Sequence, residues 1–205
     1  MAYASWASPN KTSGNGNDTV SWSASEHTGR SSRTTTATFS ASGVESKTLT
    51  IVQSGKTEFV SFSDSTATVS KDGGTLTITG TSNSSKLTFA LTGTNGIGLT
   101  LPSSYTANSV STTNGSAITG DPGATQQYTF SITFSNIGAN ATTSSKTSQL
   151  TVTPNSGSSD AVTCAITQAA GDAYLTISPT TITIPAAGTP AQSVAVSSNT
   201  NWSIS

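Results

Sequence analysis

The two ends of this 205-residue chain match the two halves of one β-sandwich module, but they stand in reversed order. The segment Thr48–Gly55 has the alternating apolar residues, the glutamine and the small-residue exit of a closing strand, and Thr163–Gly171 repeats this pattern. A new module starts after each closing strand, at Phe59 and again at Tyr174. A half sandwich can neither bury its apolar face nor pair its edge strands, so each end of the chain needs a complement.

The repeat divides the chain into three segments. Residues 57–172 hold a complete module, which we call the middle module. Residues 1–55 form the back half of a second module (the N-terminal half-module), and residues 173–205 form a front half (the C-terminal half-module). The middle module carries a Ser-, Thr- and Gly-rich insertion near residues 105–125, which we expect to form an exposed loop or hairpin.

Apolar residues alternate with polar or small residues along most of the chain, which is the period of a half-buried β-strand. Only 8% of the residues are charged, but the regular apolar alternation argues against disorder. No run of a dozen residues has a helical period. We therefore predict an all-β fold of two immunoglobulin-like β-sandwich modules, one continuous and one composed of the N- and C-terminal segments. The alternating runs are Val20–Ala24, Leu49–Ile51, Leu76–Ile78, Leu87–Leu91, Tyr128–Phe134, Leu150–Val152, Ile182–Ile184 and Val194–Val196.

The composite module can close in two ways. The first and last strands of a sandwich leave it about 20–25 Å apart, whereas the linkers at residues 54–57 and 169–173 reach at most about 14–17 Å. Closure within one chain therefore requires the two sandwiches to lie side by side and antiparallel. Exchange between chains requires only that they stack in line, and the sequence leaves both arrangements open.

Charge and single residues argue against several functions. The net charge is −1 and the eight Lys and Arg residues are scattered, so no basic stripe is available for nucleic acid. His27 is the only histidine and lies in a turn-like setting, where we expect it to be solvated. Cys164 is the only cysteine, at a strand position that predicts a buried, inert thiol. We expect no catalytic, metal or cofactor site and no enzyme activity.

The chain has no apolar stretch long enough to span a membrane, so we expect no membrane association. Its N-terminus lacks the basic start and apolar run of a secretion signal. We expect either a trimmed sequence or a protein that is made and used without export.

Three tryptophans are candidates for stacking on a sugar ring. Trp22 shares a strand face with apolar residues, and Trp202 shares one with Ile204, so both are expected to lie in a core. Trp6 lies outside a strand and is the candidate for contact with a glycan or a protein partner. If the two ends combine, the residues of the assembly joint are Trp202, Ile204, Trp6 and Trp22.

The joined order of the two ends resembles the BACON domain, the "Bacteroidetes-associated carbohydrate-binding often N-terminal" family of immunoglobulin-like modules. The resemblance covers the two half-modules, and the middle module, which lacks the Trp pair, matches more weakly. The residues that carry it are the Asn-x-x-Trp of Asn199 and Trp202, the Trp-x-x-Pro of Trp6 and Pro9, Gly14 or Gly16, Arg33 and the closing Val52-Gln53.

This resemblance implies one of two settings. Such modules occur in virion proteins of crAss-like phages, which implies a structural virion protein on the capsid surface, an auxiliary capsid or head-fibre component that contacts itself or the major capsid protein. They also occur in surface proteins of Bacteroidetes, which implies a carbohydrate-binding module for host-surface or mucin glycans, or a plain spacer. The missing secretion signal leads us to expect the virion setting.

Overall fold

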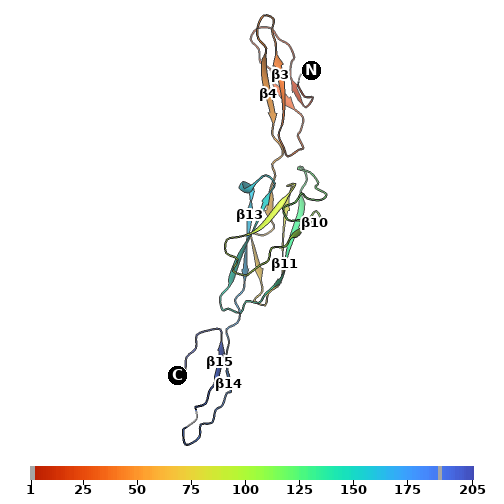
Figure 1. Ribbon diagram of the computed structural model, residues 1–205. Helices are drawn as coiled ribbons and strands as arrows, with labels where there is room; N and C mark the ends of the chain where they lie inside the picture. The colour runs from red at the N-terminus through yellow and green to blue at the C-terminus, as the bar shows by residue number, and fades with distance from the viewer. Residues whose placement is uncertain (1–2, 189–190) are drawn as a thin grey trace.

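The computed structural model describes residues 3–188 and 191–205 of the chain. These residues form three bodies in line, with the middle module between the two half-modules (Figure 1). The described residues are all-β apart from one 3-10 turn, Ser158–Asp160. This confirms the all-β class and the β-sandwich architecture, whereas the immunoglobulin-like connectivity stays a prediction.

The middle module is a sandwich of two sheets that hold nine strands. One sheet has the order β10-β9-β11-β7-β5 and the other β6-β13-β12-β8, and every pairing is antiparallel except that of β6 with β13. The strands are β5 (Val60–Phe62), β6 (Thr66–Val69), β7 (Gly74–Ser82), β8 (Leu87–Thr92), β9 (Ser104–Ala107), β10 (Val110–Thr113), β11 (Tyr128–Ile137), β12 (Lys146–Pro154) and β13 (Val162–Gln168).

The core lies between these two sheets, because successive side chains of each strand point to opposite faces. On β12 the alternate residues Leu150 and Val152 are fully buried, and on β13 Cys164 and Ile166 are fully buried. The ring of Phe89 packs edge-on against Phe130, with ring centroids 5.5 Å apart. The strands of the middle module therefore satisfy the pairing and burial that the alternation predicts.

The insertion near residues 105–125 departs in part from expectation. A hairpin is present, β9–β10, but it is not simply exposed, since β9 pairs with β11 and extends the sheet. Tyr105 and Ala107 are buried, and the Tyr105 ring contacts Phe89 edge-on at 4.8 Å between centroids. The prediction of an exposed hairpin is wrong on this face because two alternating apolar residues suffice to seat the hairpin on the core.

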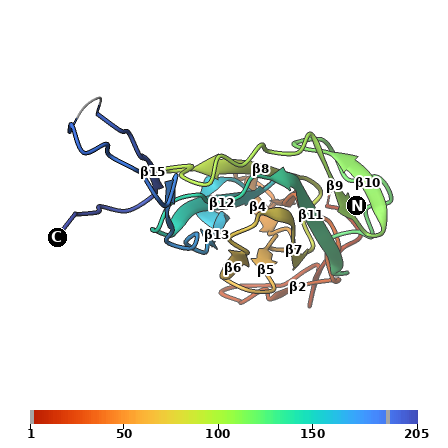
Figure 2. The same cartoon turned by 90° about the horizontal axis from the view of Figure 1, so that it is seen from below.

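The two half-modules consist of short antiparallel pairs. The N-terminal half-module holds β1 (Ala7–Pro9) paired with β2 (Trp22–Ala24), and β3 (Arg33–Phe39) paired with β4 (Lys47–Gln53). The C-terminal half-module holds only β14 (Leu175–Ser178) paired with β15 (Ala195–Ser198), and it projects away from the sandwich (Figure 2).

The two half-modules of one chain do not combine into a closed composite module. The half-modules lie at opposite ends of the middle module, so β14 and β15 do not reach β3 and β4 of the same chain (Figure 1). The run Ile182–Ile184, predicted to be a strand, forms none. A strand needs a neighbour for its backbone hydrogen bonds, and this segment has no strand partner within residues 3–188 and 191–205 of its own chain.

We predict that Leu150→Ala lowers the free energy of unfolding of the middle module by about 3 kcal/mol, because it leaves a cavity in a fully packed core. The measurement is urea denaturation followed by far-UV circular dichroism. Val110→Ala, at an exposed position of the same module, is the control and should change the stability by less than about 0.5 kcal/mol.

Candidate assembly surfaces at the two ends

The N-terminal half-module presents an open apolar face. Phe39 and Leu49 lie on the inner face of the β3–β4 hairpin, and both are exposed. A cavity of about 540 Å³ opens beside this face, with Trp22, Phe39 and Val44 in its lining. In a complete sandwich a second sheet would cover such a face.

Trp22 lies in this cavity with its polar atom unsatisfied. Its ring meets that of Tyr3 edge-on, at 5.1 Å between centroids, and the side chain is half-buried. The Trp22 Nε1 is buried and has no hydrogen-bond partner among the described residues. Buried indole N–H groups normally find an acceptor, so this face lacks a polar group as well as apolar cover.

Trp6 belongs to a small cluster with Arg33 and Gln53. The Arg33 guanidinium lies 4.6 Å from the centre of the Trp6 ring, in cation–π geometry. Arg33 Nε donates to Gln53 Oε1 at 2.9 Å, and Gln53 Nε2 donates to the Ser25 carbonyl at 2.9 Å. One face of Trp6 is thus occupied by Arg33, and three residues that carry the family resemblance meet at one place.

The C-terminal half-module is more open still. Trp202 is 51% exposed and Ile204 88% exposed, so neither residue lies in a core within one chain. The core position predicted for Trp202 belongs to the completed composite module and stays a prediction. Of the thirteen exposed large hydrophobic residues among the described ones, only Val110 lies in the middle module. The others lie in the two half-modules: Phe39, Val44, Leu49 and Val52 at one end, and Tyr174, Leu175, Ile177, Ile182, Ile184, Val194, Trp202 and Ile204 at the other.

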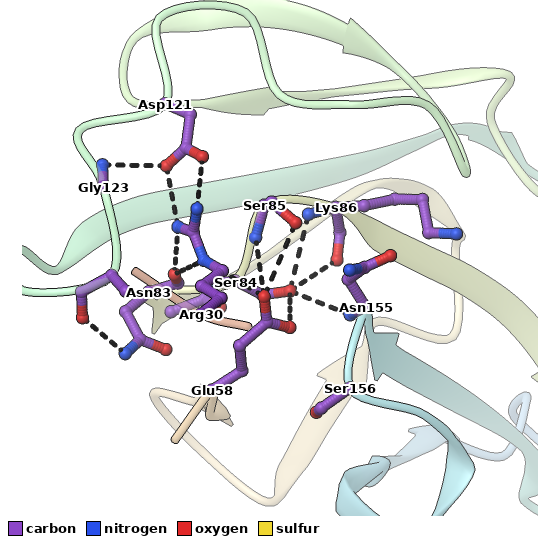
Figure 3. A network of polar contacts seen from close by, with 12 residues as sticks. Arg30, Glu58, Asn83, Ser84, Ser85, Lys86, Asp121, Gly123, Asn155 and Ser156 are labelled. Atoms are coloured by element: carbon purple, nitrogen blue, oxygen red, sulfur yellow. Dashed lines mark hydrogen bonds and ion pairs between the residues drawn. The ribbon is translucent and has the colours of Figure 1, made fainter. Parts of the chain in front are cut away.

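A polar network fixes the N-terminal half-module to the middle module (Figure 3). Arg30 donates from Nη1 and Nη2 to the two carboxylate oxygens of Asp121, at 2.7 and 2.8 Å. Its Nε lies 3.0 Å from Glu58 Oε1 and also donates to the Asn83 carbonyl at 3.1 Å. The two-pronged contact holds the guanidinium in a single orientation between the two bodies.

Hydrogen bonds connect both carboxylates of this network to neighbouring side chains. Glu58 is buried and accepts a hydrogen bond from Ser84 Oγ at 2.8 Å. The hydrogen bonds from Arg30 lower the pKa of Asp121, and those with Asp121 raise the pKa of Arg30. No sequence pattern predicts this network, because Arg30 and Asp121 are 91 residues apart and neither lies in a motif.

The junction on the other side of the middle module is weaker. Asn199 Nδ2 donates across it to the Ala141 carbonyl at 3.1 Å and to the Asp172 carbonyl at 2.9 Å, and both hydrogen bonds are exposed. Asp172, the last residue of the middle module, pairs with Lys71 of the same module, and both side chains are exposed, at 39% and 79%. Exposed polar contacts of this kind contribute little to stability.

The remaining sequence predictions concern single side chains. Cys164 is buried in β13, as predicted, and burial raises the pKa of its thiol. His27 lies in a loop, where its side chain is half-buried and its Nε2 contacts the Ser31 carbonyl at 2.7 Å. Within residues 3–188 and 191–205, no three His, Cys, Asp or Glu side chains gather where they could hold a metal ion. In the same ranges, no helix has the length and apolar character needed to cross a membrane.

We predict that Arg30→Met lowers the free energy of unfolding of the middle module by about 2–3 kcal/mol, because it leaves the buried Glu58 without its cation. Urea denaturation measures this change. Lys47→Met removes the exposed partner of Glu45 and should have an effect below about 0.5 kcal/mol. Equal effects of the two substitutions would contradict a special role for the network.

The lowered pKa of Asp121 predicts a pH dependence. Its folded-state pKa lies below the ordinary value of 3.8, so its ion pair stabilises the fold fully above that pH and loses this effect as the pH falls through the folded pKa. The difference in unfolding free energy between the native protein and Asp121→Asn should therefore be constant near neutral pH and shrink in acid. A difference that stays constant down to acid unfolding would contradict this assignment.

Comparison with known proteins leaves the family open. No protein-family model and no curated protein matches the chain. Among solved structures, the chain is similar to an endo-fucoidan hydrolase of glycoside hydrolase family 107, with a TM-score of 0.24 and 12% sequence identity. The match covers 83% of this chain and 22% of that protein, so the chain spans about a fifth of its length.

Proposed function

We propose that this protein is a non-enzymatic structural subunit that associates with copies of itself through its two ends. The observation that carries the proposal is the distribution of exposed apolar residues, of which twelve of thirteen lie in the half-modules. Contiguous apolar surface on a soluble protein marks an interaction site. The middle module has one such exposed residue, Val110, and separates the two half-modules that form the interaction surfaces.

We also propose the setting, an auxiliary capsid or head-fibre protein of a bacteriophage virion. The family resemblance supports this setting, and a weakly charged sandwich rich in Ser and Thr suits an exposed capsid surface. Partners would be further copies of the chain or the major capsid protein. Detection of the chain by mass spectrometry in purified virions tests this part of the proposal, and its absence from them would contradict it.

A carbohydrate-binding module is the alternative, and Trp202 is the residue that favours it because its indole is exposed. Trp6 supports it less, since Arg33 covers one face of the ring. The alternative predicts saturable glycan binding by the monomer that Trp202→Ala abolishes. The structural proposal predicts no such binding.

We predict that the intact protein forms species larger than its 20.5 kDa monomer as its concentration rises, as measured by sedimentation velocity. Ile204→Asp should weaken this association at least tenfold, because Ile204 is 88% exposed in the monomer and would become buried on association. Val110→Asp changes an exposed apolar residue of the middle module and should leave association unchanged. A protein that stays monomeric up to millimolar concentration would refute the proposal.

A further inference from the structure

We propose that the C-terminal half-module of one copy completes the N-terminal half-module of a second copy as a β-sandwich with a defined strand register. In this joint, residues 181–184 form a strand parallel to β4, and Trp202–Ile204 form a strand antiparallel to β3. The inference rests on the proposed function and names the partner of both ends, which is a second copy of this chain.

The C-terminal half-module already has the geometry of the front half of the middle module. In the middle module Val60 pairs with Ser82 and Phe62 with Gly80, and at the C-terminus Leu175 pairs with Ser198 and Ile177 with Val196. Each pairing therefore has the same register. Val60 is 6% exposed, whereas its counterpart Leu175 is 56% exposed, so the second element is folded but uncovered.

The side-chain hydrogen bonds at the end of the β5–β7 pair also recur at the end of the β14–β15 pair. Asn83 Oδ1 accepts from the Phe59 amide at 2.8 Å, and Ser82 Oγ donates to the Phe59 carbonyl at 2.6 Å. The same atoms of Asn199 and Ser198 contact the Tyr174 amide and carbonyl at 3.0 and 2.8 Å. Such agreement requires a common local fold and not only a similar apolar pattern.

The N-terminal half-module repeats the back half of the middle module in the same way. In the β12–β13 hairpin Lys146 pairs with Gln168, and in the β3–β4 hairpin Arg33 pairs with Gln53. The pairing then continues in step through seven residues of each strand. Leu49 occupies the position of the fully buried Cys164, yet Leu49 is exposed.

The missing neighbours of β3 and β4 follow from the middle module. There β6 runs parallel to β13, with Ala67 opposite Ile166 and Val69 opposite Gln168. Transferred through the repeat, this register places Ile182 opposite Ile51 and Ile184 opposite Gln53. The unpaired segment 181–184 would thereby gain the strand partner that it lacks in one chain.

The second missing neighbour is the counterpart of β8, which pairs with β12 through Phe89 opposite Val152 and Leu87 opposite Pro154. The apolar alternation of Trp202-Ser203-Ile204 matches Leu87-Thr88-Phe89. It places Ile204 opposite Phe39 and Trp202 opposite Ala41. Phe39 and Ala41 both line the 540 Å³ cavity, so the indole of Trp202 has a cavity to enter.

The occupant is a second copy because each chain carries both halves, and Figure 1 shows them separated by the whole middle module. The two open faces are also complementary in kind, since one lacks the strands and apolar residues that the other supplies. Association through unlike surfaces leaves one free half-module at each end of a growing chain of subunits.

Mixing two defective full-length variants tests the pairing of unlike ends. Phe39→Asp disables the N-terminal half-module and Ile204→Asp disables the C-terminal one, so each variant alone should be monomeric. A 1:1 mixture has one intact half of each kind and should form a species of twice the 20.5 kDa chain mass, containing one copy of each variant. Sedimentation velocity with one variant fluorescently labelled measures the stoichiometry.

The outcomes separate this inference from the proposed function. If the intact protein associates but the mixture stays monomeric, the unlike-end pairing is wrong while self-association stands. If the intact protein does not associate, both fail. Unchanged far-UV circular dichroism and thermal melting of the middle module in each variant show that the chain has folded.

Engineered disulfides test the register. Ser40→Cys with Ser203→Cys places two exposed thiols directly opposite each other, within the Cα separation that a disulfide needs, so oxidation should give covalent dimers and larger species. Thr36→Cys with Ser203→Cys is the control, because Thr36 lies four residues further along β3, about 13 Å away. The fully buried Cys164 of the native protein should not react. Intrachain disulfides, or equal cross-linking of the two pairs, would overturn the proposed register.

Discussion

A β-sheet with one apolar face is stable only when a second sheet covers that face, and this constraint governs the whole molecule. In the middle module nine strands meet the constraint, and Leu150, Val152, Cys164 and Ile166 lose all contact with water. In the half-modules the same strand register leaves equivalent positions exposed. The middle module is therefore the complete form of the sandwich of which each end of the chain has one half.

The polar contacts between modules fix orientation, whereas the core provides apolar burial. Arg30 joins two bodies by binding Asp121 through its two terminal nitrogens, Nη1 and Nη2, and its Nε lies within ion-pair distance of the buried Glu58. A bidentate pair with a low exposed fraction gives orientation as well as attraction, because it is satisfied in one geometry only. The N-terminal half-module is in this way held in a fixed direction relative to the middle module (Figure 3).

Periodicity was sufficient to predict the fold class and most strands, because alternation is a local property. It failed where a strand depends on a distant partner: Ile182–Ile184 has the pattern of a strand but no strand partner in the described part of the chain. It also missed the seating of Tyr105 on the core, since two apolar residues are too few to indicate burial. The Arg30 network could not be predicted from the sequence, because no local pattern links two residues that are 91 positions apart.

The two junctions of the middle module differ in strength, and this has a mechanical consequence. One is held by the bidentate ion pair of Arg30 with Asp121, whereas at the other the Asn199 side chain donates two exposed hydrogen bonds, to the Ala141 and Asp172 carbonyls. In a fibre of such subunits, thermal bending would concentrate at the second kind of link. The fibre would then behave as rigid rods of two modules joined by compliant hinges, with one hinge in each repeat along its length.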